Sequence, residues 1–159
     1  MLLIVYHSAT GGTRQMADAA LEGARAEGEA RLLHAADAGP ADLIGAGGYL
    51  FAAPENLASL AGVMKDFFDR TYYPVLGRLN GRPYAAMICA GSDGQGAARQ
   101  IARIATGWRL REVAAPLIIC TRAQTPEAIL APKIIPPDAL TPCRDLGAAL
   151  AAGQALGIF

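Results

Sequence analysis

The sequence has few cysteines, no excess of either charge and no long apolar run. Three cysteines in 159 residues are too few, and odd in number, for a disulfide framework, so we expect reduced thiols and a cytoplasmic location. The 14 basic and 14 acidic side chains balance, which argues against a dedicated nucleic-acid binder. No apolar run approaches the roughly 20 residues of a membrane span. The apolar N-terminal segment lacks the basic flank of a signal peptide, so we do not expect it to be one.

Hydrophobic residues make up 53% of the chain and charged residues only 18%, which indicates a folded protein. We find no internal repeat and no linker, and therefore expect one domain over residues 1–159. Several short segments are apolar continuously rather than alternately, which is typical of parallel strands buried on both faces of a sheet. The predicted strands are residues 2–6, 49–53, 84–90 and 115–121, with a weaker edge strand at 30–34.

Helical patterns fall between these strands. They cover residues 13–26, 40–44, 60–68 and 97–108, and a last helix is expected to begin at Thr141-Pro142, where a capping hydroxyl precedes a proline. This alternation predicts a three-layer, doubly wound α/β fold with a five-stranded parallel sheet. Right-handed crossovers leave few topologies, of which strand order 2-1-3-4-5 is the economical one.

Residues 122–141 do not follow the pattern. Their four prolines exclude a central strand. Thr125-Pro126-Glu127 predicts one helical turn, and the rest is either surface loop or a partner contact, two alternatives that the sequence leaves open.

Ligands of doubly wound sheets bind beyond the carboxyl ends of the strands, here at residues 7–13, 53–59 and 90–96. The first loop, Ser8-Ala9-Thr10-Gly11-Gly12-Thr13, offers hydroxyl groups, helix N–H groups and glycines that let the backbone wrap around an anion. It has no lysine and no Gly-x-Gly-x-x-Gly spacing, so neither a nucleoside triphosphate nor a dinucleotide fits it. We expect a single terminal phosphate held by neutral donors, rather than an ordinary glycine-rich turn.

Ser8-x-Thr10-Gly11-x-Thr13 after an N-terminal strand resembles the FMN-phosphate loop of the flavodoxin superfamily. Pro54-Glu55-Asn56, followed by residues 65–70, resembles the Thr-Pro-x-Tyr…Lys-x-x-x-Asp region of NAD(P)H-dependent FMN reductases and quinone reductases. Residues 90–96 resemble the glycine-rich loop beside the flavin in those enzymes. Two positions depart from the family pattern: Ala53 replaces a common threonine, and Asn56 replaces a tyrosine.

The resemblance implies FMN as the cofactor, no metal, and no catalytic side chain, because the flavin itself provides the chemistry. The residues implied to hold its phosphate are Ser8, Thr10, Gly11, Gly12 and Thr13. Those implied to line the ribityl chain and the ring are Pro54, Glu55, Asn56, Leu57, Ala90, Gly91, Ser92, Asp93 and Gly96. For Glu55, capping of the helix that follows is an equal alternative.

Residues 53–59 and 90–96 contain no aromatic side chain, whereas electron-carrying flavodoxins usually stack the flavin between aromatic rings from these loops. The open ring face and the neutral net charge favour an FMN-dependent oxidoreductase that takes electrons from NAD(P)H and passes them to quinones or other small acceptors. The alternatives are a flavodoxin-type electron-transfer protein and a flavodoxin-fold binding module without redox turnover. The sequence does not choose between NADH and NADPH, and it does not name the acceptor.

Several other side chains lie near these loops. Tyr72 and Tyr73 either pack on a surface or interface, or cover the site of a neighbouring subunit in a homo-oligomer. Arg99 and Arg103 either face solvent or hold the phosphates of a nicotinamide cofactor. Cys89, Cys120 and His7 lie near strand ends, where we expect buried inert thiols and a packing histidine.

Overall fold

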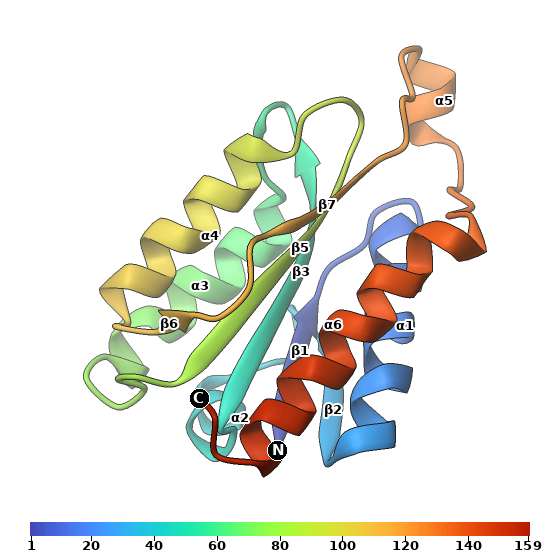
Figure 1. Cartoon of the computed structure of the whole chain (residues 1–159). Helices are drawn as coiled ribbons and strands as arrows, with labels where there is room; N and C mark the ends of the chain where they lie inside the picture. The colour runs from blue at the N-terminus through green and yellow to red at the C-terminus, as the bar shows by residue number, and fades with distance from the viewer.

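The computed structural model describes residues 1–159 and shows a twisted parallel sheet between two layers of helices (Figure 1). The strand order is β2-β1-β3-β5, and two short strands then pair with opposite ends of β5. The predicted order 2-1-3-4-5 is therefore confirmed, with the fifth strand split in two. The parallel strands are β1 (Leu2–Tyr6), β2 (Ala30–His34), β3 (Gly48–Asn56), β5 (Pro83–Ala90), β6 (Arg111–Glu112) and β7 (Leu117–Cys120).

Helices α1 and α6 cover one face of the sheet, and α3 and α4 cover the other (Figure 1). Alternate residues of one strand enter opposite cores: Leu3 and Val5 pack with α3 and α4, whereas Leu2 and Ile4 pack with α1 and α6. This two-sided burial explains the continuous apolar runs. The helices are α1 (Gly12–Glu27), α2 (Pro40–Gly45), α3 (Gly62–Val75), α4 (Gln95–Gly107), α5 (Pro126–Leu130) and α6 (Pro137–Ala155). None combines the length and the apolar composition of a membrane span.

The segment predicted as the second loop is instead a β-hairpin. Strand β3 continues to Asn56, turns at Leu57 and Ala58, and returns as β4 (Ser59–Leu60), which pairs antiparallel with β3. Both turn residues have a positive φ, 51° and 59°. A two-residue hairpin turn of this hand normally uses glycine or asparagine, so Leu57-Ala58 carries no turn signal. The backbone strain, about 1–2 kcal/mol for each residue, lies at one end of the sheet.

The last helix begins at Pro137, four residues before the predicted start. A proline in the first helical turn costs nothing, because its missing N–H would have no partner there. Pro142 then lies inside the helix, where it removes only the bond to the carbonyl of Asp138. The helical turn predicted at Thr125 is confirmed as α5, and the Thr125 hydroxyl accepts a hydrogen bond from Ala128 N at 3.2 Å.

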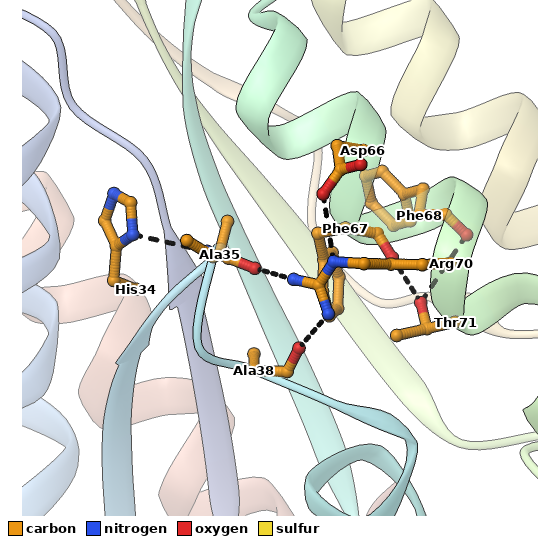
Figure 2. Close-up of polar contacts among 9 residues, drawn as sticks. His34, Ala35, Ala38, Asp66, Phe67, Phe68, Arg70 and Thr71 are labelled. Atoms are coloured by element: carbon orange, nitrogen blue, oxygen red, sulfur yellow. Dashed lines mark hydrogen bonds and ion pairs between the residues drawn. The ribbon is translucent and has the colours of Figure 1, made fainter.

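Arg70 connects α3 to the loop that follows β2 (Figure 2). Its guanidinium donates to the carbonyl oxygens of Ala35 and Ala38, the latter at 2.9 Å, and pairs with Asp66 at 2.9 Å. These carbonyls belong to an irregular connection that has no strand partner for them. Arg70 therefore satisfies backbone acceptors that would otherwise lack a protein donor.

We expect Arg70→Ala to lower the free energy of unfolding by about 1–3 kcal/mol, because it removes charged hydrogen bonds to two carbonyls. The control is Lys65→Ala, which breaks the exposed i,i+4 pair with Asp69 on the same helix and should cost less than about 0.5 kcal/mol. Urea denaturation of the two variants measures both changes. Equal losses would show that Arg70 contributes no more than a surface ion pair.

Candidate functional site

Two adjoining cavities open at the carboxyl ends of the central strands. The first has a volume of about 280 Å³ and is lined by the Ser8–Thr13 loop, the end of β5 and the segment after β7. The second, of about 450 Å³, lies beside the hairpin. The residues that line both are Glu55, Asn56, Gly91, Ala123 and Ile129. The cavities therefore form one elongated site, at the edge of the sheet predicted from the topology.

The loop Ser8–Thr13, which the sequence predicts to bind phosphate and which we call the phosphate loop, contains a buried hydroxyl group without a partner. Gly11 caps α1 with a φ of +88°, a conformation that favours glycine, and its N–H donates to Ser8 Oγ at 3.1 Å. Thr13 is only 1% exposed and lines the first cavity, and its Oγ1 has no hydrogen-bond partner in the protein. A buried hydroxyl without a partner costs about 1–3 kcal/mol. Together with the free N–H groups of the first turn of α1, it fits an anionic acceptor such as a phosphate.

Glu55 belongs to the hairpin, and its side chain contacts the start of α4. Its carboxylate accepts hydrogen bonds from the N–H groups of Gly94 at 2.8 Å and Ala97 at 3.0 Å, at the positive end of α4. Glu55 therefore caps a helix, but this helix is α4 and not α3, the helix that follows it in the sequence. The reason is that β3 continues beside β5, which places Glu55 next to the loop that leaves β5.

Most of the residues predicted to hold a ligand come together around the two cavities. Those lining the first are Ser8, Thr10, Thr13, Pro54, Glu55, Asn56, Ala90 and Gly91, and the second adds Leu57 and Ser92. Gly11 and Gly12 form the start of α1 and line neither cavity. Asp93 and Gly96 also line neither, and a Cβ atom at Gly96 would collide with the carbonyl of Ala58, so this glycine serves the packing of the hairpin.

Comparison with known proteins agrees with this geometry. Residues 40–119 match the family model of NADPH-dependent FMN reductases. The chain belongs to this family. It is also 35% identical over 97 residues to a flavodoxin of Aquifex aeolicus (strain VF5), a match that covers 60% of this chain and 52% of that protein. The matched part thus spans about half the length of the flavodoxin.

Solved structures share the fold of this FMN reductase family member. A flavodoxin from an archaeon superposes with a TM-score of 0.73 at 18% identity, covering 94% of this chain and 95% of the other. A WrbA-like protein from Agrobacterium tumefaciens gives a TM-score of 0.68 at 20% identity, covering 96% and 97%. The predicted membership of the flavodoxin superfamily is confirmed.

Sequence reasoning missed one wall of the site. Residues that line the cavities but were not predicted are Ala9, Ala58, Cys89, Thr121, Ala123, Gln124, Ile129, Leu130 and Lys133. Most belong to the segment between β7 and α6, which has no periodic pattern that would place it. Cys89 is buried as expected, and burial raises the pKa of its thiol, so Cys89 stays protonated near neutral pH. Cys120 was expected to be buried and is exposed, because β7 pairs with β5 alone and its other edge is free.

The remaining candidates lie outside the two cavities. His7 Nδ1 lies 3.2 Å from His34 Nε2, and burial, followed by the charge of His34, lowers the pKa of His7. Arg99 and Arg103 line a separate hollow farther along α4. This position favours the alternative in which both arginines face solvent, rather than holding the phosphates of a nicotinamide cofactor. Tyr72 stacks on Trp108 with ring centroids 5.8 Å apart, whereas Tyr73 is 78% exposed.

We expect Glu55→Ala to lower the free energy of unfolding by about 1–3 kcal/mol, because it removes two charged hydrogen bonds from the first turn of α4. Amide hydrogen exchange at Gly94 and Ala97 should accelerate at the same time. Glu55→Gln retains one acceptor and should lie between the wild type and Glu55→Ala. Unchanged exchange at these two amides would contradict the capping role.

Proposed function

We propose that this chain is an FMN-dependent oxidoreductase that takes electrons from NADH or NADPH and passes them to quinones or other small acceptors. The observation that supports this most directly is the lining of the second cavity. Leu57, Ala58, Ala123 and Ile129 provide its apolar side chains, and no aromatic ring lines either cavity. With no aromatic side chain to stack on it, a flavin bound in this site would keep one ring face open for a second planar molecule.

The residues fit FMN at both ends of the elongated site. Ser8, Thr10 and Thr13 provide neutral donors for the phosphate, and the orphaned Thr13 Oγ1 would gain an acceptor. Pro54 and Asn56 would border the ribityl chain, and Leu57, Gly91 and Ser92 the ring. The second cavity, about 450 Å³, lies in the usual range for small-molecule sites, and the first, about 280 Å³, lies just below it.

In this proposal the protein orients the cofactor and shields it, and FMN supplies hydride and electron transfer when it is bound. Three titratable side chains line the cavities, and the Lys133 ammonium is bonded to backbone carbonyls of α5 and the residue after it. The Glu55 carboxylate is bonded to the first turn of α4, and the Cys89 thiol has a raised pKa. No acid–base pair of the chain is needed for turnover.

A flavodoxin-type electron carrier is the second candidate, because the curated relative at 35% identity is named a flavodoxin. The two functions differ in what reduces the flavin. An enzyme accepts a hydride from a nicotinamide nucleotide directly, whereas a carrier needs a separate reductase.

We expect anaerobic mixing of the FMN-loaded protein with NADH or NADPH to bleach the visible flavin absorption without a further protein. Free FMN at the same concentration is the control and should bleach far more slowly. Reduction by a flavodoxin reductase, but by neither nucleotide alone, would select the carrier. A purified protein that takes up no FMN would contradict both functions.

We expect Thr13→Val to weaken FMN binding by about 0.5–3 kcal/mol and to leave riboflavin binding unchanged, because only FMN has the phosphate that this hydroxyl would contact. The flavin-free variant should be as stable as the wild type or more stable, since the substitution removes a buried hydroxyl without a partner. Thr13→Ser keeps the hydroxyl and serves as the control. Fluorescence titration and urea denaturation measure the two effects, and equal losses for both flavins would show that Thr13 does not contact the phosphate.

A further inference from the structure

A segment distant in the sequence closes the first cavity opposite the phosphate loop. The chain between β7 and α6 extends past the carboxyl ends of the strands, on the side where α1 begins (Figure 1). Lys133 N donates to the carbonyl of Thr10 at 2.7 Å. The Gln15 side chain donates to the carbonyls of Gly11 at 2.9 Å and Lys133 at 2.7 Å. Residue 133 is thus fixed against the loop by hydrogen bonds on both sides.

The side chain of Lys133 has a fixed charge without a carboxylate partner. Its Nζ donates to the carbonyl oxygens of Ala128, Ile129 and Ala131 at 2.8, 2.8 and 2.6 Å, around the C-terminal end of α5. All three N–H donors are satisfied by neutral oxygens. Lys133 takes part in none of the ion pairs of the protein. No carboxylate therefore neutralises the positive charge of Lys133, which lines the first cavity.

No other cationic side chain lines either cavity. The acidic side chain there, Glu55, already faces the positive end of α4. The phosphate loop itself contributes only neutral donors: the hydroxyls of Ser8, Thr10 and Thr13 and the N–H groups of α1. A phosphate monoester has a charge between −1 and −2 near neutral pH, and a fixed cation beside it lowers its free energy.

We propose that Lys133 is the charge partner of the FMN phosphate, so that the site selects the phosphorylated flavin over riboflavin. This inference rests on the proposed function, because it assigns a role within the same site. The cation acts from the C-terminal end of α5, where the backbone of residue 133 is bonded to the phosphate loop at Thr10. Gln15 is a positioning residue, since its amide holds the backbone of residue 133 against the phosphate loop.

The test compares dissociation constants of FMN and riboflavin, measured by quenching of flavin fluorescence on the flavin-free protein. We expect Lys133→Gln to weaken FMN binding about tenfold or more and to change riboflavin binding less than about twofold. Lys133→Arg should retain FMN affinity. Arg25→Gln removes the same charge near the opposite end of α1, outside both cavities, and should leave both constants unchanged. Added salt should weaken FMN binding in the wild type more than in Lys133→Gln.

Each other outcome overturns the inference in a recognisable way. Equal losses of FMN and riboflavin in Lys133→Gln would show that Lys133 only shapes the cavity through α5. Unchanged FMN affinity in Lys133→Gln would show that the charge of Lys133 does not contribute to phosphate binding. The proposed function would not be affected by that result. A wild type that binds neither flavin would overturn the proposed function, and the role of Lys133 with it.

Discussion

Helices α1 and α6 approach each other so closely that a Cβ atom at Gly23 would overlap the carbonyl of Arg144, and one at Gly147 would overlap the carbonyl of Ala20. Only glycine permits this contact, because any side chain would separate the two backbones. Helix α1 begins at the phosphate loop, and α6 begins directly after the segment that contains Lys133. The packing of the two helices therefore fixes the segment against the loop and allows Gln15 to connect them. The cavity depends on this contact although neither glycine lines it.

The same architecture explains why several residues that lower the stability of the fold lie at the site. The sheet is buried on both faces, so polar side chains that bind a ligand are confined to its edge. At that edge, Leu57 and Ala58 have left-handed backbone conformations, and Thr13 buries a hydroxyl without a partner. Each of these features lowers the stability of the ligand-free chain. A bound phosphate would satisfy Thr13, so ligand binding and folding are coupled through this residue.

Local patterns in the sequence were sufficient for the strand order, for most helices and for placing the Ser8–Thr13 loop at a cavity, because buried parallel strands and helix starts have characteristic compositions. Local patterns were insufficient where contacts between segments distant in the sequence determine the structure. The β3–β4 turn uses Leu57 and Ala58, which give no turn signal, and the last helix begins at Pro137 rather than at the expected cap, Thr141. Glu55 caps α4 because β3 and β5 are neighbours, and the wall that contains Lys133 follows from the contact of α1 with α6. Neither the capping contact nor this wall can be predicted from the sequence of a single segment.

The lining of the second cavity also bears on the class of acceptor under the proposed function. Its side chains are small or aliphatic, and Leu57, at the tip of the hairpin, is fully exposed beside it. Aromatic rings stacked on the flavin would occupy the volume that a second planar ring needs. Without them, a flavin ring bound here would have beside it the apolar residues of the cavity and the amides of Asn56 and Gln124. The one charged side chain there, Glu55, has both carboxylate oxygens bonded to N–H groups at the start of α4, and the cavity offers no cation, so under the proposed function the surroundings favour an uncharged planar acceptor over an anionic one.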